Sequence, residues 1–162
     1  MEQEITPELG EMRREVRSFV EGPLRGWAER LDEEEVISGE LIALLARQGY
    51  LEMRISEEYG GAGLGIEHYC MVQEEVSRCH PMLSLILASS SGLAPGAIQR
   101  HGTDEQKEKY LMRIPTGELR TAFALTEPEA GSDAAALRTR ARKTADGYVI
   151  DGIKHFISHV ES

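Results

Sequence analysis

The change from a helical to an extended pattern falls in residues 119–133, which are Leu119-Arg120-Thr121-Ala122-Phe123-Ala124-Leu125-Thr126-Glu127-Pro128-Glu129-Ala130-Gly131-Ser132-Asp133. The first half of this stretch, from Leu119 to Leu125, is predicted to be a buried strand. Its second half is a loop that contains Pro, Gly, Ser, Thr and Asp. Such a loop, at the end of a rigid element, offers backbone N–H groups and hydroxyls, which suits a planar ligand with polar edges. From the residues alone, a binding loop and an ordinary turn fit equally well.

The residues before this stretch are predicted to be helical. Apolar residues recur at helical spacing. Thr6, Ser38 and Thr103 are predicted N-caps, and Gly22-Pro23, Gly49 and Pro115 are expected to end the helices that follow them. The expected helices are Pro7 to Gly22, Ser38 to Gly49, Ile66 to Arg78, Met82 to Ile98 and Thr103 to about Ile114. The fourth is expected to be a buried central helix distorted at Pro95. The fifth begins with a capping box, because Gln106 stands three residues after Thr103.

The residues after the stretch alternate as strands do. Leu137 to Thr144 places Arg138, Arg140 and Arg142 on one face, and Asp146-Gly147 predicts a tight hairpin turn into Tyr148-Val149-Ile150. Asp151-Gly152 predicts a second turn, into a strand from Ile153 to Ser158. The predicted fold class is α+β, with an N-terminal all-α domain over residues 1–118 and an incomplete antiparallel β domain over residues 119–162.

Composition excludes several classes of function. The 162 residues are 41% hydrophobic, which is enough for a core, and the formal charge of −10 disfavours binding to nucleic acid or to an anionic membrane. The acidic start, residues 1–4, does not resemble a leader peptide, and the apolar run Met82 to Ala88 is too short to span a bilayer. Cys70 and Cys79 would lie roughly 13 Å apart on one helix, too far for a disulfide. We therefore expect reduced thiols and a cytoplasmic protein.

Other motifs predict no chemistry of their own. Gly60 to Gly65 lacks the third glycine of a dinucleotide fingerprint and the Lys-Ser or Lys-Thr of a P-loop, so we expect a flexible turn between helices. The five histidines show no metal-ligand spacing, and no metal site is predicted. Ser132 does not stand in the Gly-x-Ser-x-Gly elbow of a hydrolase.

Four groups of residues nevertheless resemble the acyl-CoA dehydrogenase family, in the family's order. Residues 125–128 with 130–133 closely resemble its signature loop, and residues 59–65 are similar to a loop of its helical domain. The third group is residues 101–118, and the fourth is residues 146–152 with Lys154. The signature loop is a specific signal, and the resemblance extends from about residue 10 to the end.

The resemblance implies FAD as cofactor and an acyl-CoA thioester as substrate. In the family, a carboxylate removes the α-proton while the β-hydrogen leaves as hydride to the flavin. By position, the implied FAD-binding residues are Phe123, Leu125, Thr126, Gly131, Ser132, Phe156, Ile157 and Ser158. Ser132 would also contact the substrate. Phe156 and Ser158 replace the Trp and Thr that the family usually has, which keeps an apolar ring and a hydroxyl.

The resemblance also implies what this chain does not carry. No glutamate matches the family's catalytic base, so no catalytic residue is assigned, and the C-terminal helical bundle lies outside these residues. A second chain could supply that part, and the intact family forms homo-oligomers. The electron acceptor would be an electron-transfer protein or oxygen, and an acyl-CoA oxidase stays possible. A non-catalytic, helical partner-binding module, or a remnant of a disrupted gene, is the alternative from another class.

Overall fold

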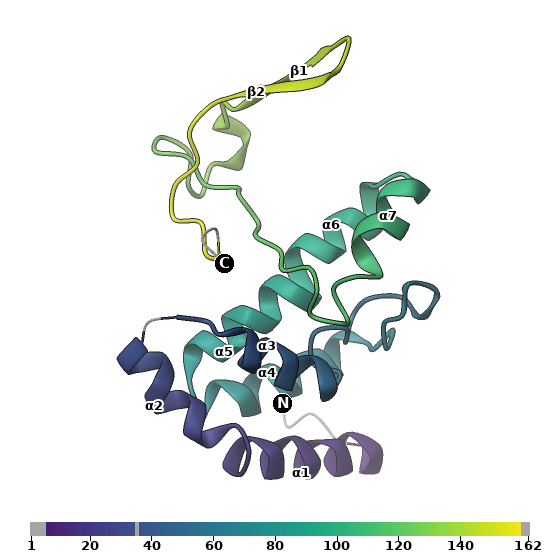
Figure 1. Ribbon diagram of the computed structural model, residues 1–162, viewed down its shortest axis with the longest axis vertical. Coiled ribbons are helices and arrows are strands. Elements are labelled where there is room, and N and C mark those ends of the chain that lie inside the picture. The colour runs from purple at the N-terminus through teal and green to yellow at the C-terminus, as the bar shows by residue number, and fades with distance from the viewer. Residues whose placement is uncertain (1–5, 35, 160–162) are drawn as a thin grey trace. The chain divides into compact units, whose positions relative to one another are not determined.

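The computed structural model describes residues 6–34 and 36–159, and it divides the chain into two compact units, Met1–Thr121 and Ala122–Ser162 (Figure 1). The first unit is helical, and the second contains one antiparallel hairpin. The fold class predicted from the sequence is therefore confirmed. The acidic start, residues 1–4, lies outside the described residues.

The helical unit contains the five predicted helical segments and one more. Its α-helices are α1 (Pro7–Glu21), α2 (Arg25–Glu34), α3 (Gly39–Arg47), α4 (Ile66–Ser77), α5 (Pro81–Leu87), α6 (Ala94–His101) and α7 (Asp104–Leu111). Thr6 and Ser38 cap α1 and α3 through their hydroxyls, and the capping box of Thr103 and Gln106 is present at α7. Helix α2 was not predicted, because its ten residues bury only Leu31 and so carry no apolar pattern.

The predicted central helix is one continuous helix in the structure (Figure 1). It consists of α5, a π-helical segment, Ala88–Leu93, and α6. The distortion precedes Pro95, because Pro95 has no N–H to give to the turn before it. The helix is less buried than predicted: Leu83 and Leu87 are fully buried, whereas Leu93 is 57% exposed.

By length and composition, Pro81–His101 could also cross a membrane. The core helix of a soluble protein passes the same test, so this observation favours neither kind of protein.

The main core joins α1, α3, α4 and α5. Its fully buried members include Leu24, Leu41, Leu45, Val72 and Leu87. A smaller cluster of Ile55, Leu111 and Ile114 packs beneath the loop that leads to α4. Burial of each such side chain contributes roughly 1.5–3 kcal/mol, so apolar contact is the main stabilisation of this unit.

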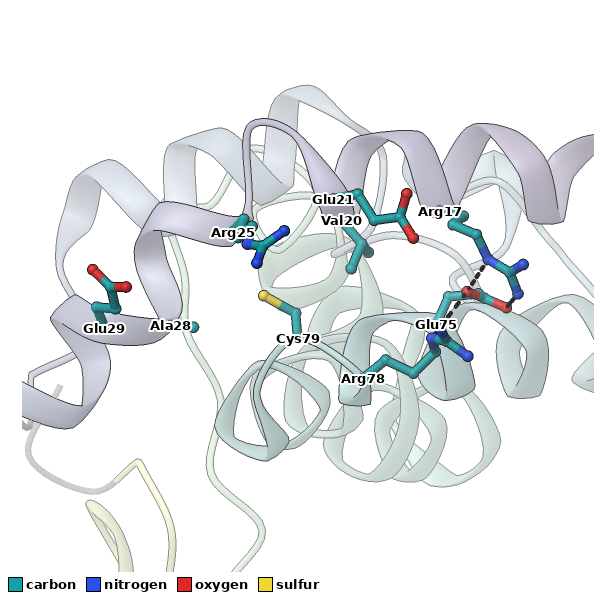
Figure 2. A pocket seen from close by; sticks show the side chains of 9 residues that line it. All are labelled: Arg17, Val20, Glu21, Arg25, Ala28, Glu29, Glu75, Arg78 and Cys79. Atoms are coloured by element: carbon teal, nitrogen blue, oxygen red, sulfur yellow. Dashed lines mark hydrogen bonds and ion pairs between the residues drawn. The ribbon is translucent and has the colours of Figure 1, made fainter.

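One charged side chain is buried beside this core. Glu75 of α4 is 1% exposed, and its two carboxylate oxygens accept hydrogen bonds of 2.9 and 2.7 Å from Nε and Nη2 of Arg17 in α1 (Figure 2). The hydrogen bond from Arg17 is the main cause that lowers the pKa of Glu75 below its ordinary value, and Arg13 and Arg78 add to it. A buried carboxylate needs such a partner, so this pair fixes α1 against α4.

The glycine-rich loop between α3 and α4 is more constrained than predicted. The N–H groups of Gly61 and Gly63 donate to the carbonyls of Ser56 and Ile55, and Leu64 donates to Met53. A Cβ atom at Gly61 would lie 2.0 Å from the Ile55 carbonyl oxygen, so no side chain fits there. The loop is a tightly packed turn.

The second unit contains the hairpin of β1 (Arg140–Thr144) and β2 (Gly147–Asp151). Thr144 pairs with Gly147, so the turn residues are Ala145 and Asp146, one position earlier than predicted. Arg140 and Arg142 lie on one face of β1, as the alternation predicted.

Two predicted strands are wrong. The segments 119–125 and 153–158 are not strands, and Phe123 and Leu125 are 38% and 40% exposed instead of buried. A strand requires a hydrogen-bonded neighbour, and none of the residues that the structure describes provides one for these segments.

We expect Glu75→Gln to lower the free energy of unfolding of the helical unit by about 1.5–3 kcal/mol, because it weakens two charge-assisted hydrogen bonds. The pKa of Glu75 is lowered in the folded state, so its stabilisation is present above the ordinary pKa of 4.5 and is lost as the pH falls below it. Urea unfolding followed by fluorescence of the single tryptophan, Trp27, measures both effects.

The matched control is Glu74→Gln. Glu74 is 61% exposed and paired with Arg13, so its loss is expected to change stability by less than about 1 kcal/mol. Equal effects of the two substitutions would contradict the role given to burial.

We expect Gly61→Ala to destabilise the helical unit by several kcal/mol, because the new methyl group overlaps the Ile55 carbonyl. Gly96→Ala is the control, since its Cβ meets nothing within 4 Å. In helix α6 it is expected to stabilise by roughly 0.5–1 kcal/mol. Thermal unfolding monitored by circular dichroism compares the two, and an unchanged midpoint for Gly61→Ala would contradict the close packing.

Candidate functional site

The signature loop folds into a tight turn around Glu127. The N–H of Glu127 donates to the carbonyl of Ala130 at 3.0 Å, and the N–H of Ala130 donates to the carbonyl of Glu127 at 3.1 Å. Glu127 and Ala130 are the two residues of this loop that are buried. Asp133 ends the loop by accepting a hydrogen bond from the N–H of Ala135.

The carboxylate of Glu127 binds two further segments of the same unit. It accepts hydrogen bonds from the N–H groups of Arg138 (2.7 Å) and Thr139 (2.9 Å), just before β1, and from Nζ of Lys154 (2.9 Å), after β2. Gly152 lies close to Thr139: a Cβ atom at position 152 would be 2.3 Å from the hydroxyl oxygen of Thr139. Both ends of the hairpin are therefore held at the loop.

These contacts favour the ionised carboxylate. The Thr139 side chain, the N–H of Arg138 and the ammonium of Lys154 together lower the pKa of Glu127 to about 2. Glu127 is therefore a carboxylate at neutral pH, with its oxygens occupied by donors. That arrangement suits a structural anchor and is unsuited to a proton-accepting base.

Two neighbours of Glu127 are held by the same segment. Nζ of Lys154 donates to the carbonyl of Leu125 at 2.8 Å, and the N–H of His155 donates to the carbonyl of Thr126 at 2.8 Å. Among the described residues, nothing accepts a hydrogen bond from the N–H or the hydroxyl of Thr126. The carbonyls of Leu125 and Thr126 are thus held by hydrogen bonds, while the N–H and hydroxyl of Thr126 stay available to a ligand.

The predicted FAD-binding residues come from two segments that the Thr126–His155 bond joins. Next to His155, Phe156 is 85% exposed, has a left-handed backbone (φ 56°) and stacks on the His155 ring with centroids 4.3 Å apart. The other predicted residues are exposed, except for the half-buried Thr126 and Ile157. A non-glycine residue at positive φ costs roughly 1–2 kcal/mol, which marks Phe156 as unusual.

The chemistry of these residues is compatible with the flavin that the family resemblance implies. Exposed apolar side chains at Phe123, Leu125 and Phe156 could cover a flat ring, and the available N–H and hydroxyl of Thr126 could meet its polar edge. Gly131 and Ser132 follow the Ala130 turn, and both residues are exposed.

A cavity of about 550 Å³ lies elsewhere, in the helical unit (Figure 2). It is lined by charged side chains of α1, α2 and α4, among them Arg17, Arg25, Glu29 and Glu75, with the Cys79 thiol between them. Burial raises the pKa of that thiol, which makes it less reactive. The cavity contains none of the predicted FAD-binding residues. Within residues 6–34 and 36–159, no group of three or more His, Cys, Asp or Glu could hold a metal.

Sequence reasoning missed the two residues that organise the loop, Glu127 and Lys154. Both belong to motifs that carried the family resemblance, but neither was given a role. The signal that could have found them is their opposite charge: an acidic residue in the loop and a lysine after the predicted hairpin. It points to a contact only once the hairpin is known to bring the two segments together.

Comparison with known proteins agrees with the geometry. Residues 6–118 match the family model "Acyl-CoA dehydrogenase, N-terminal domain", and residues 122–162 match "Acyl-CoA dehydrogenase, middle domain". The chain is 39% identical over 147 residues to 3-(aryl)acrylate reductase of Clostridium sporogenes, covering 91% of this chain and 39% of the relative. It is 37% identical over 159 residues to the short-chain specific acyl-CoA dehydrogenase of Clostridium acetobutylicum, covering 98% and 42%.

A solved structure agrees as well. A glutaryl-CoA dehydrogenase from Mycobacterium smegmatis, in complex with FADH2, matches with a TM-score of 0.86 and 29% identity, over 94% of this chain and 39% of that one. The chain thus spans about two fifths of the length of the relatives it matches. It belongs to the acyl-CoA dehydrogenase family, of which it contains the N-terminal domain and part of the middle domain.

Proposed function

We propose that this chain supplies the flavin-contacting part of an FAD-dependent oxidoreductase that acts on the Cα–Cβ bond of an acyl-CoA thioester. The observation that carries the proposal is the pairing of Thr126 with His155, next to the exposed Phe156. It brings the two predicted flavin-binding segments together and leaves the Thr126 donors available. The relatives named above include a reductase and a dehydrogenase, so the proposal covers transfer in either direction.

The roles of the residues follow from their chemistry. When bound, FAD would accept or give the hydride. The N–H and hydroxyl of Thr126 would stabilise the negative charge that reduction places on the polar edge of the ring. Phe123, Leu125 and Phe156 would cover apolar ring surface, with Ile157 beside them. Ser158 would add a hydroxyl, and Gly131 and Ser132 would contact FAD, with Ser132 also meeting the substrate.

The rest of the reaction needs groups from outside these residues. In this proposal, the base that removes the α-proton comes from further polypeptide or from a second chain. The electron acceptor is an electron-transfer protein or oxygen. The working form is a homo-oligomer in the cytoplasm.

A non-catalytic module is the second candidate. The observation that favours it is the exposed apolar surface of the second unit, where Ile150, Ile153 and Tyr148 are 73%, 69% and 67% exposed. A surface of this kind suits docking to another protein. Flavin binding separates the two candidates.

We expect the 162-residue chain alone to bind FAD weakly and to self-associate, because its flavin residues are exposed and its hairpin has two open edges. The measurement is flavin absorbance after gel filtration with added FAD. A yellow monomer with one FAD per chain would show that this expectation is wrong.

The proposed function itself is tested by complementation. The chain is co-expressed with the segment of the C. acetobutylicum dehydrogenase that follows the region matched here. We expect this pair to retain FAD and to lose flavin absorbance when butyryl-CoA is added without oxygen. A soluble pair that retains no FAD would reject the proposed function and favour the non-catalytic module.

We expect Phe156→Ala to weaken FAD binding by the complemented pair roughly two- to tenfold, the equivalent of one aromatic contact. Tyr148→Ala is the matched control, since Tyr148 is an aromatic residue of the same unit and is 67% exposed. Titration of the apo pair with FAD gives both constants. Equal losses would remove Phe156 from the proposed site.

A further inference from the structure

Three consecutive residues of the signature loop are held by two consecutive residues after the hairpin. Lys154 donates to the Leu125 carbonyl at 2.8 Å, His155 donates to the Thr126 carbonyl at 2.8 Å, and Lys154 donates again to the Glu127 carboxylate at 2.9 Å. The residue before Thr126 is therefore held through its carbonyl, and the residue after it through its carboxylate. The carbonyl of Thr126 is held by His155.

The lysine is itself held in place. Its side chain is 25% exposed, and its partner carboxylate on Glu127 is 6% exposed and anchored by the N–H groups of Arg138 and Thr139. The Lys154 ammonium donates to the Leu125 carbonyl and to the Glu127 carboxylate at the same time, so it links these two groups. Exposed lysine pairs contribute little, but this one is partly buried and has two acceptors.

We propose that Lys154 is a positioning residue for the flavin-edge donors of Thr126, holding the backbone before and after Thr126 so that its N–H and hydroxyl face the ligand. The inference rests on the proposed function, in which those donors contact FAD. It assigns to Lys154 no contact with FAD or substrate.

The physical reason is preorganisation. Donors that are already aimed where charge develops stabilise that charge without reorganising at the moment of reaction. The hydrogen bonds of Lys154 and His155 use the carbonyls of Leu125 and Thr126, so the peptide planes that carry the neighbouring N–H groups cannot turn freely. Loss of the ammonium frees the plane between Leu125 and Thr126, which carries the Thr126 N–H.

The first test needs no flavin. In the isotopically labelled chain, Lys154→Met keeps most of the side-chain length and removes the ammonium. We expect the carbonyl carbon resonance of Leu125 to move upfield, and the pKa of Glu127 to rise from about 2 toward its ordinary value of 4.5. Lys143→Met is the control, since Lys143 is exposed on β1 and none of the described residues accepts a hydrogen bond from its ammonium. An unchanged Leu125 resonance and Glu127 titration would overturn the inference.

The second test uses the complemented, flavin-loaded pair. We expect Lys154→Met to weaken binding of reduced FAD about tenfold relative to oxidised FAD, which equals a fall of about 30 mV in the two-electron potential. Lys154→Arg restores a donating cation and is expected to recover most of the potential. A lysine with only a structural role would lower stability and leave the potential of the retained flavin unchanged, and that result would overturn the inference.

The two failures can be told apart. If the wild-type pair retains no FAD, the proposed function fails, and the role of Lys154 toward flavin fails with it. If the wild-type pair retains FAD and the Lys154→Met pair retains it at the same potential, the proposed function stands and only the positioning role is rejected.

Discussion

The second unit depends on one carboxylate. Glu127 joins its own loop to the start of the hairpin and to the segment after the hairpin, through donors from Arg138, Thr139 and Lys154. The unit has little apolar core of its own, with Ala130 as its one buried hydrophobic residue among those described. Where apolar burial is this small, a local network of charge-assisted hydrogen bonds decides which segments lie together.

The helical unit follows a different rule. Its core of leucines, isoleucines and valines supplies most of the stability, and the Arg17–Glu75 pair adds orientation between α1 and α4. Glu75 is buried while Arg17 is partly exposed, and loss of either partner would leave the pair broken, so the pair favours the arrangement of α1 and α4 in which both hydrogen bonds form. The two units thus use the same chemistry, a carboxylate surrounded by donors, for different purposes.

Features that depend on residues a few positions apart could be predicted from the sequence, whereas features that depend on distant residues could not. Caps at Thr6, Ser38 and Thr103, and the alternation of β1, concern residues a few positions apart, and they were predicted correctly. The strands expected at 119–125 and 153–158 failed because a strand depends on a partner, which a local pattern does not contain. The site showed the same division. The loop was recognised from its own residues, whereas the roles of Glu127 and Lys154 depend on contacts 27 positions apart in the chain.

The π-helical segment has a consequence for the length of the chain. A π-turn holds one residue more than an α-turn, so Ala88–Leu93 absorbs what amounts to a single inserted residue. The faces on either side stay in phase: Leu83 and Leu87 before it and Pro95 after it all point into the protein. The serine run from Ser89 to Ser91 is therefore where a homologue could be one residue shorter. Such a deletion would restore a regular helix without rotating either half out of the core.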